Sequence, residues 1–193
     1  LSNYDTDGIL LNLIDYAPFC KFSEVNKLSS ILTEWILELR KVALKAEQKQ
    51  GRRKRIYVHI PSHPKTWKEV GYDVPAWVSK NLVDGLVCQS GLHHGPIDQN
   101  VSLSDAVDLV KETDCRVLVA LRGGETAPQI WGAAANAYTQ GADGVGFGGS
   151  SWSMSGWPWT GPEYKTLRLL GHPDMLSNAD KHYMVHQDID ERH

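Results

Sequence analysis

Apolar residues gather in five short runs along the chain, and each run is typical of a buried β-strand. Three of the runs begin with Asp-Gly, at Asp7-Gly8, Asp84-Gly85 and Asp143-Gly144. Gly tolerates the positive backbone angle of a turn, Asp can accept hydrogen bonds from neighbouring amides, and an unalternating apolar run suits a strand covered on both faces. This repeated pattern predicts a parallel α/β protein.

Between the runs, apolar residues recur at spacings of three and four, which predicts helices. The longest helix should open at Ser23, and its apolar stripe from Val25 to Val42, with Trp35 in it, should lie on the sheet as part of the core. Right-handed crossovers would make all five strands parallel, with the helices outside. The predicted strands are 7–15, 56–60, 83–90, 116–121 and 145–149, and helices are predicted after Ser23, within 64–80 with Pro75 at a helix start, and over 102–112, 128–140 and 163–170.

Composition narrows the class of protein. A chain of 193 residues with 41% hydrophobic residues can form one domain with a sizeable core, and a net charge of −3 gives no reason to expect nucleic acid or an anionic membrane as a partner. No run approaches the roughly 18 apolar residues of a membrane span. The widely spaced Cys20, Cys88 and Cys115 are typical of small buried residues rather than of disulfides or a zinc site.

The organisation along the chain predicts one folded unit over residues 1–185 and a charged tail over 186–193. The chain enters its first predicted strand almost at once after Leu1, which favours a processed or fragmentary chain. The basic loop predicted over 48–55 allows a nucleic-acid patch, but a solvated turn that caps the preceding helix is the favoured interpretation.

Five parallel units can form an open, doubly wound sheet or an arc of a barrel. The residues after Leu13 contain no GxGxxG loop, which argues against a dinucleotide fold. In a (β/α)8 barrel the functional loops follow the carboxyl ends of the strands, and here those loops are rich in polar and aromatic residues. They contribute Asn12, Asp15, Tyr16, His59, His63, Gln89, Ser90, His93, His94, Arg122, Glu125, Trp152, Trp157 and Trp159.

Several segments together resemble one family. They are the run from Tyr4 to Asn12, then Val58-His-Ile-Pro61, the block Gly71-Tyr-Asp-Val-Pro-Ala-Trp77, Gly141-Ala-Asp-Gly-Val145 and Leu169-Leu-Gly-His-Pro173. From about Tyr4 to Val185, the chain resembles the C-terminal part of family-10-like glycosyl hydrolase (β/α)8 proteins. The resemblance implies a partial TIM barrel whose five strands correspond to strands four to eight, with the first three supplied elsewhere.

The chain departs from that family at the first strand. Relatives typically read Asp-Gly-Ile-Glu-Leu-Asp-Phe there, whereas this chain has Leu10 in place of the Glu and Asn12 in place of the Asp. An amide can neither lose a proton nor form a glycosyl ester, so Asn12 cannot serve as acid, base or nucleophile. The loss of two carboxylates leaves it open whether the chain is an enzyme.

Two carboxylates remain as catalytic candidates at the predicted barrel mouth, Asp15 and Glu125, with Asp98 as a third. Glycoside hydrolysis needs an acid and a second carboxylate roughly 5 to 10 Å apart. The alternatives are structural: Asp15 would bond its own turn, and Glu125 would be a first-turn acid of a helix. His59 could bond a sugar hydroxyl, or it could be a satisfied structural group before Pro61.

The segment from Ser150 to Gly161 is the best ligand signal, because it sets Trp152, Trp157 and Trp159 among Ser, Gly and Pro. The apolar face of a sugar stacks well on an indole while its hydroxyl groups bond polar side chains, although a core role for one Trp is equally open. The polar candidates for substrate binding are Asn12, Tyr16, His59, Gln89 and Arg122. The pair His93-His94 has no third ligand at a fixed spacing, so we expect no metal and no cofactor.

Two functions follow as expectations. One is a glycoside hydrolase-like barrel that acts on or binds a polysaccharide at the carboxyl ends of its strands. The other is a catalytically inactive barrel that serves as a glycan-binding or assembly subunit. An arc of five strands has bare lateral edges, so we expect it to pair with a missing N-terminal part of the barrel or with another chain. The resemblance implies an extracellular or cell-envelope location, on which the residues themselves are silent.

Overall fold

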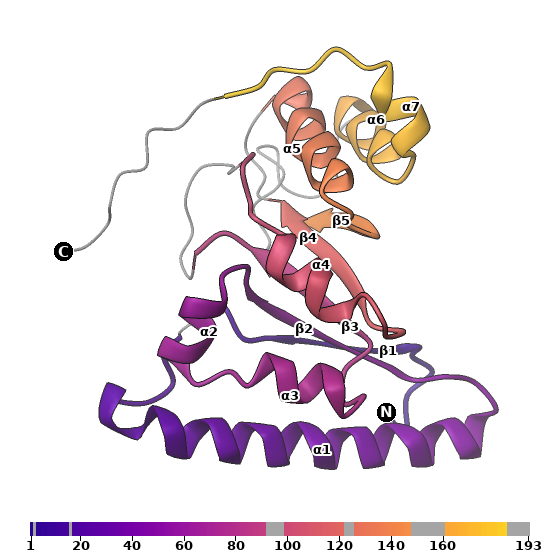
Figure 1. Ribbon diagram of the computed structural model, residues 1–193. Coiled ribbons are helices and arrows are strands. Elements are labelled where there is room, and N and C mark those ends of the chain that lie inside the picture. Colours follow the sequence, from indigo (N-terminus) through magenta and orange to yellow (C-terminus); the bar gives the residue numbers. More distant parts are fainter. Residues whose placement is uncertain (2, 16, 92–98, 122–125, 148–160, 185–193) are drawn as a thin grey trace.

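The structure is a computed structural model, and it describes residues 1, 3–15, 17–91, 99–121, 126–147 and 161–184. Its centre is a sheet of five parallel strands, which lie in the order in which they occur along the chain (Figure 1). The predicted α/β class and the five parallel strands are therefore confirmed. The strands are β1 (Gly8–Asn12), β2 (Arg55–Pro61), β3 (Gly85–Gln89), β4 (Arg116–Leu121) and β5 (Gly144–Phe147).

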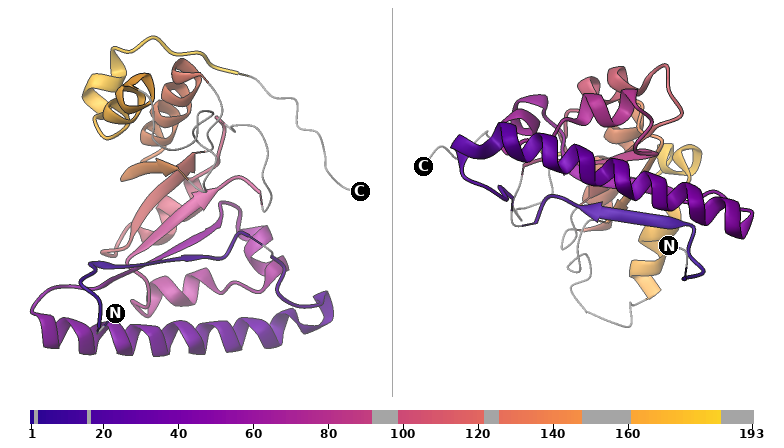
Figure 2. Two further views of the ribbon diagram at one scale, coloured as in Figure 1. Left: turned by 180° about the vertical axis from the view of Figure 1, so that it is seen from behind. Right: turned by 90° about the horizontal axis from the view of Figure 1, so that it is seen from below.

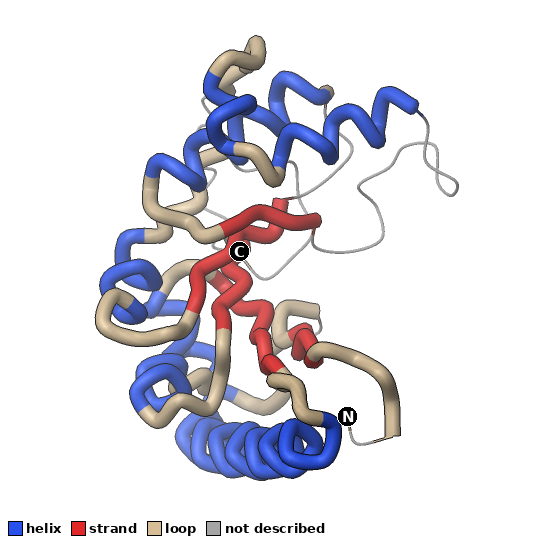
Figure 3. The backbone as a smooth tube through the Cα atoms, turned by 90° about the vertical axis from the view of Figure 1, so that its right-hand side faces the viewer, coloured by secondary structure: helices blue, strands red, loops and turns tan. Residues whose placement is uncertain are grey.

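The helices lie round the outer side of the curved sheet, and none of the described helices covers its inner side (Figure 3). Sequential strand order with helices on one side differs from a doubly wound dinucleotide fold, which reverses its strand order and carries helices on both faces. The described helices are η1 (Phe22–Glu24), α1 (Val25–Gln50), α2 (Pro64–Val70), α3 (Val74–Ser79), α4 (Ser104–Val110), α5 (Ala127–Thr139), α6 (Gly161–Leu170) and α7 (Pro173–Ser177).

The core lies between the sheet and these helices. Alternate residues of a strand point to opposite faces, and in β2 the outward-pointing Ile56, Val58 and Ile60 are fully buried. By the same alternation and the strand register, Leu10 of β1 and Tyr57 of β2 share the inner face. Tyr57 is only half-buried and Leu10 is 55% exposed. The outer face of the sheet is thus the hydrophobic core, and the inner face is open.

Two of the three Asp-Gly turns fasten one strand to the next. The carboxylate of Asp84 accepts a hydrogen bond from the backbone N–H of Ile56 at 2.8 Å, and that of Asp143 accepts one from the N–H of Val117 at 2.8 Å. In both cases the amide belongs to the strand that precedes the turn in sheet order. The predicted role of Asp as an acceptor for neighbouring amides is confirmed at these two turns. The predicted positive backbone angle at the Gly is wrong, because φ is not positive at Gly8, Gly85 or Gly144.

The long helix α1 packs on the sheet through a narrower stripe than its sequence predicts. Leu32, Ile36 and Ala43 are buried, but Ile31 and Trp35 are 52% and 45% exposed. The prediction that Trp35 belongs to the core is wrong, because the apolar positions of α1 span a wider arc of the helix than the sheet covers. In the views of Figure 2, α1 runs beside β1 at one end of the sheet.

The Gly71-Tyr-Asp-Val-Pro-Ala-Trp77 block forms the junction between α2 and α3. Gly71 has a left-handed φ of 78°, and an added Cβ there would lie 2.9 Å from the carbonyl oxygen of Val25. The Asp73 carboxylate caps α3 by accepting from the N–H of Ala76 at 3.2 Å, and Pro75 lies in the first turn as predicted. Trp77 is fully buried, and its ring centroid lies 5.9 Å from that of Tyr72.

Some boundaries differ from those predicted. β1 ends at Asn12 rather than at Asp15, because the chain turns at Asn12. Ser23 caps no helix through its side chain, since it lies inside η1. The basic segment before β2 is not simply a solvated turn, because Lys54 is fully buried and its ammonium group bonds the carbonyl oxygen of Thr6. The additional helix α7 follows α6.

Candidate functional site

Three of the predicted binding residues lie on the inner face of adjacent strands, at their carboxyl ends. Asn12 is the direct partner of His59 in the β1–β2 register, and Gln89 is the partner of Pro61, two residues beyond His59. Neighbouring strands lie about 4.8 Å apart, so Asn12 and His59 stand side by side. His59 and Gln89 are 5% and 4% exposed, while Asn12 is exposed. The register thus brings Asn12, His59 and Gln89 together, and we call them the inner-face polar group.

Asn12 organises the turn that follows β1. Its side-chain Oδ1 accepts hydrogen bonds from the backbone N–H of Ile14 at 3.0 Å and of Asp15 at 3.3 Å. Its Nδ2 donates to Oδ2 of Asp15 at 2.8 Å. Asp15 therefore lies beside the inner-face polar group, half-buried, with its carboxylate held by the amide of Asn12. The side chain of Asn12 thus acts as a turn-forming amide.

The loop after β2 adds a residue that sequence reasoning missed. The backbone N–H of Ser62 donates to the carbonyl oxygen of Gln89 at 2.8 Å, which ties this loop to the end of β3. Ser62 is 2% exposed, and its Oγ has no hydrogen-bond partner among the described residues. Buried hydroxyl groups without a partner are uncommon in folded proteins. A Ser after Ile-Pro gives no signal in the sequence beyond that of a turn.

Tyr72 was also missed as a support of the site. Its hydroxyl group donates to the carbonyl oxygen of Leu13 at 2.5 Å, so the α2–α3 junction anchors the turn that carries Asp15. Burial raises the pKa of Tyr72 above its usual range, so the phenol stays protonated as a donor. The Gly-Tyr-Asp-Val-Pro-Ala-Trp block marked this region in the sequence, but not the long-range contact to Leu13.

The other predicted site residues lie outside the described part of the chain. They are Tyr16, Arg122, Glu125, Trp152, Trp157 and Trp159, together with His93, His94 and Asp98. Among the residues that are described, no three His, Cys, Asp or Glu side chains converge in a way that could hold a metal ion.

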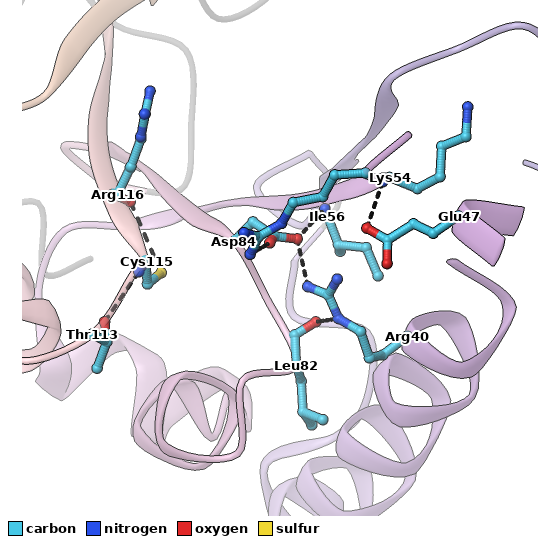
Figure 4. A network of polar contacts seen from close by, with 10 residues as sticks. Arg40, Glu47, Lys54, Ile56, Leu82, Asp84, Thr113, Cys115 and Arg116 are labelled. Atoms are coloured by element: carbon cyan, nitrogen blue, oxygen red, sulfur yellow. Dashed lines mark hydrogen bonds and ion pairs between the residues drawn. The ribbon is translucent and has the colours of Figure 1, made fainter. Parts of the chain in front are cut away.

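A second polar cluster lies at the opposite, amino ends of the strands (Figure 4). Asp84 accepts hydrogen bonds from Arg40 Nη2 at 2.5 Å and from Arg53 Nη2 at 2.7 Å, in addition to the Ile56 amide. Burial alone would raise the pKa of Asp84, but the Ile56 N–H and the two guanidinium groups together lower it below its usual value. Two of these partners are cationic and the third is a backbone amide, so the cluster fastens α1 to β2 and β3.

On the helical side, two of the grooves are lined by described residues. The larger, of about 840 Å³, runs between α1 and the amino ends of the strands and is lined in part by Arg40, Arg53 and Asp84. The smaller, of about 440 Å³, lies among α1, α2 and α3, beside Trp67 and Tyr72. Neither groove includes a member of the inner-face polar group.

The described cysteines are all free thiols. Cys88 and Cys115 are buried, as predicted, and burial raises the pKa of each thiol to about 12. Cys20 is only half-buried, so the prediction of three buried cysteines holds for two of them.

Comparison with known proteins adds no family assignment. No protein-family model matches the chain, and no curated protein matches it either. Within the described residues, no helix is both long enough and apolar enough to cross a lipid bilayer.

Proposed function

We propose that this chain is a glycoside hydrolase-like barrel segment that binds a polysaccharide at the carboxyl ends of its strands, on the inner face of the sheet. The observation that carries the proposal is the inner-face polar group: Asn12, His59 and Gln89 stand on three adjacent strands, on the face that no described helix covers. Amide and imidazole groups bond sugar hydroxyl groups, and an open parallel sheet binds ligands at the carboxyl ends of its strands.

Three further features support a carbohydrate as the ligand. The half-buried ring of Tyr57 lies on the same face, two residues before His59. The chain continues from β5 into the segment with Trp152, Trp157 and Trp159, and aromatic rings stack on the apolar faces of sugars. The sequential strand order with helices on one side is also the winding of a TIM-barrel arc, which is the fold that the family resemblance implies.

Binding without hydrolysis is the favoured form of this function. Asn12 occupies the place of a family carboxylate. Its Oδ1 accepts a hydrogen bond from the Ile14 amide of the turn, and its Nδ2 donates to Asp15. The position of Asp15 at the carboxyl edge keeps hydrolysis as the second candidate, with Asp15 and Glu125 as the carboxylate pair. In that case Glu125 would act as the acid and Asp15 as the second carboxylate.

Binding is tested by affinity electrophoresis of the chain in gels that contain soluble polysaccharides of different backbones. We expect retardation in at least one gel, and we expect Gln89→Ala and Trp157→Ala each to reduce it. Loss of one stacked ring or one bonded amide should weaken binding roughly tenfold. Leu44→Ala is the control, because this exposed Leu lies on α1, outside the sheet, and its loss should leave retardation unchanged. If the parent chain migrates in every polysaccharide gel as far as it does in a gel without polysaccharide, glycan binding is refuted.

Hydrolysis is tested by the release of reducing ends from the polysaccharide that binds. We expect no release above that of a Glu125→Gln, Asp15→Asn double variant. Release by the parent that the double variant lacks would make the second candidate the correct one. Binding assays on the same double variant separate the loss of chemistry from the loss of substrate.

A further inference from the structure

Both lateral edges of the sheet present unpaired backbone groups among the described residues. At the two ends of β1, the backbone carbonyl oxygen of Asp7 accepts a hydrogen bond from the N–H of Arg55 at 2.9 Å, and the N–H of Leu13 donates to the carbonyl oxygen of His59 at 3.1 Å. The backbone groups of the odd-numbered residues therefore face β2. Successive residues of a strand point their backbone groups to opposite sides, so Gly8, Leu10 and Asn12 face outward. In β5 the N–H of Asp143 donates to Val117 at 2.7 Å, which turns the N–H groups of Gly144 and Gly146 outward in the same way.

The carboxylate of Asp7 indicates which strand orientation would pair with the outer edge of β1. At the equivalent turns, Asp84 and Asp143 bind a backbone amide of the preceding parallel strand. Asp7 begins the same Asp-Gly turn, but β1 is the first strand of the sheet. Its carboxyl group is 82% exposed, and it lies 3.2 Å from Arg52 Nη1 at the surface. The repeated turn therefore predicts a parallel strand beside β1, with an N–H opposite Asp7.

The free flank of α1 lies on the same side as this edge. Thr33 accepts from Trp77 Nε1 at 2.9 Å and Arg40 reaches Leu82 and Asp84, so this flank of α1 faces α3 and β3. Trp35 follows Thr33 by two residues, about 200° round the helix, and so lies on the other flank. Ile31, Trp35 and Val42 are 52%, 45% and 42% exposed there. A strand added to β1 would bring its own helix against these side chains.

We propose that a second copy of this chain supplies that strand, with the outer edge of its β5 paired in parallel with the outer edge of β1. The N–H of Gly144 in the second copy would then meet Asp7, as the Ile56 amide meets Asp84. The helix that follows β5 is α6, whose exposed Tyr164, Lys165 and Arg168 match the apolar flank and the acidic Glu34 and Glu38 of α1. Two such contacts, related by a two-fold axis, close a ring of two copies and leave no free edge.

The first experiment measures the mass of the chain in solution by light scattering and native mass spectrometry. We expect twice the mass of the 21.5 kDa chain. Leu10→Pro removes an outward N–H of β1, and Gly146→Pro removes one of β5; proline is tolerated at such edge positions, so each variant should fold and be monomeric. A parent chain that remains monomeric at about 100 µM would overturn the proposal, because the dissociation constant of the dimer would then be far above about 100 µM.

Mixing the two proline variants tests the head-to-tail pairing. One intact β1 edge and one intact β5 edge remain in the mixture, so a mixed dimer should form although neither variant dimerises alone. A mixture that stays monomeric, or a dimer that survives either proline variant, would assign the contact to other surfaces and overturn the proposal.

A pair of α1 variants decides the question if a proline variant fails to fold by circular dichroism. Trp35→Glu should weaken dimerisation at least tenfold, whereas Leu44→Glu should leave it unchanged. Leu44 has a similar exposure, 47% against 45% for Trp35, but lies on the opposite flank of the same helix. Equal effects of the two variants would overturn the proposal. Glycan retardation is a separate readout, so loss of dimerisation and loss of ligand binding are distinguished.

Discussion

Asp84 shows how one carboxylate can hold three elements together. Its two oxygens receive the guanidinium group of Arg40 from α1, that of Arg53 from the segment before β2, and the amide of Ile56 in β2. The side chain of Asp84 is 5% exposed, so the charge is stable there only because all of its partners are present. Removal of the negative charge would leave Arg40 buried without its counter-ion.

We expect Asp84→Asn to lower the free energy of unfolding by about 3 kcal/mol, as is typical when one partner of a buried ion pair is lost. Asp143→Asn is the matched control. Asp143 makes the same contact to a backbone amide but is exposed, and no guanidinium bond to it is observed among the described residues. It should cost about 1 kcal/mol. Urea unfolding at pH 7 measures both, and equal costs would contradict the role assigned to the buried pair.

The lowered pKa of Asp84 also makes its contribution depend on pH. The folded state binds the proton less readily than the unfolded chain, in which the pKa of Asp is about 3.9. The stabilisation is therefore complete above that value and declines as the pH falls below about 4, through the folded pKa. We expect the difference in unfolding free energy between the parent and Asp84→Asn to shrink from pH 7 to pH 3. A constant difference would show that the charge contributes nothing.

At the scale of elements, two helices end in a glycine with the same backbone but different surroundings. Gly51 ends α1 at a φ of 69°, and an added Cβ would meet no atom within 4 Å. Gly71 ends α2 at a φ of 78°, and its Cβ would press on the Val25 carbonyl at 2.9 Å. The close approach of α2 to the start of α1 therefore depends on Gly71.

We expect Gly51→Ala to lower the free energy of unfolding by about 1 kcal/mol, which is the cost of a left-handed backbone alone. Gly71→Ala should cost about 3 kcal/mol, because the contact with Val25 is added to the same backbone cost. Thermal or urea unfolding of the two variants measures the difference. A cost for Gly71→Ala no greater than for Gly51→Ala would show that α2 moves freely away from α1.

The helix α1 also shows where sequence patterns lose precision. Spacings of three and four located the helix, but they gave one apolar stripe that included Trp35. The buried apolar residues of α1 are Leu32, Ile36, Ala43 and Ala46, and Leu39 packs against the core while partly exposed. Periodicity identifies an apolar flank of a helix without saying which part of it has a neighbour, because that depends on which strand lies at the edge of the sheet.

For the whole molecule, five apolar runs, three of which begin with Asp-Gly, were sufficient to predict five parallel strands, because an unalternating apolar run suits a strand that is buried in a parallel sheet. The parallel arrangement then placed Asn12, His59 and Gln89 at one edge without knowledge of any side-chain contact. The supports of the site could not be predicted in this way. Tyr72 bonds Leu13 at a sequence separation of 59 residues, and the backbone of Ser62 bonds the end of β3. Such contacts arise only from tertiary packing.

The order of the strands in the sheet has a consequence for biosynthesis. Each strand from β2 to β5 lies beside the one that precedes it in the chain. When a new strand leaves the ribosome, the strand with which it pairs has therefore already been synthesised. Domains fold as the chain emerges from its amino end, and contacts between near neighbours form quickly. The sheet can therefore grow in one direction during translation, strand by strand, with no need to insert a late segment between earlier ones.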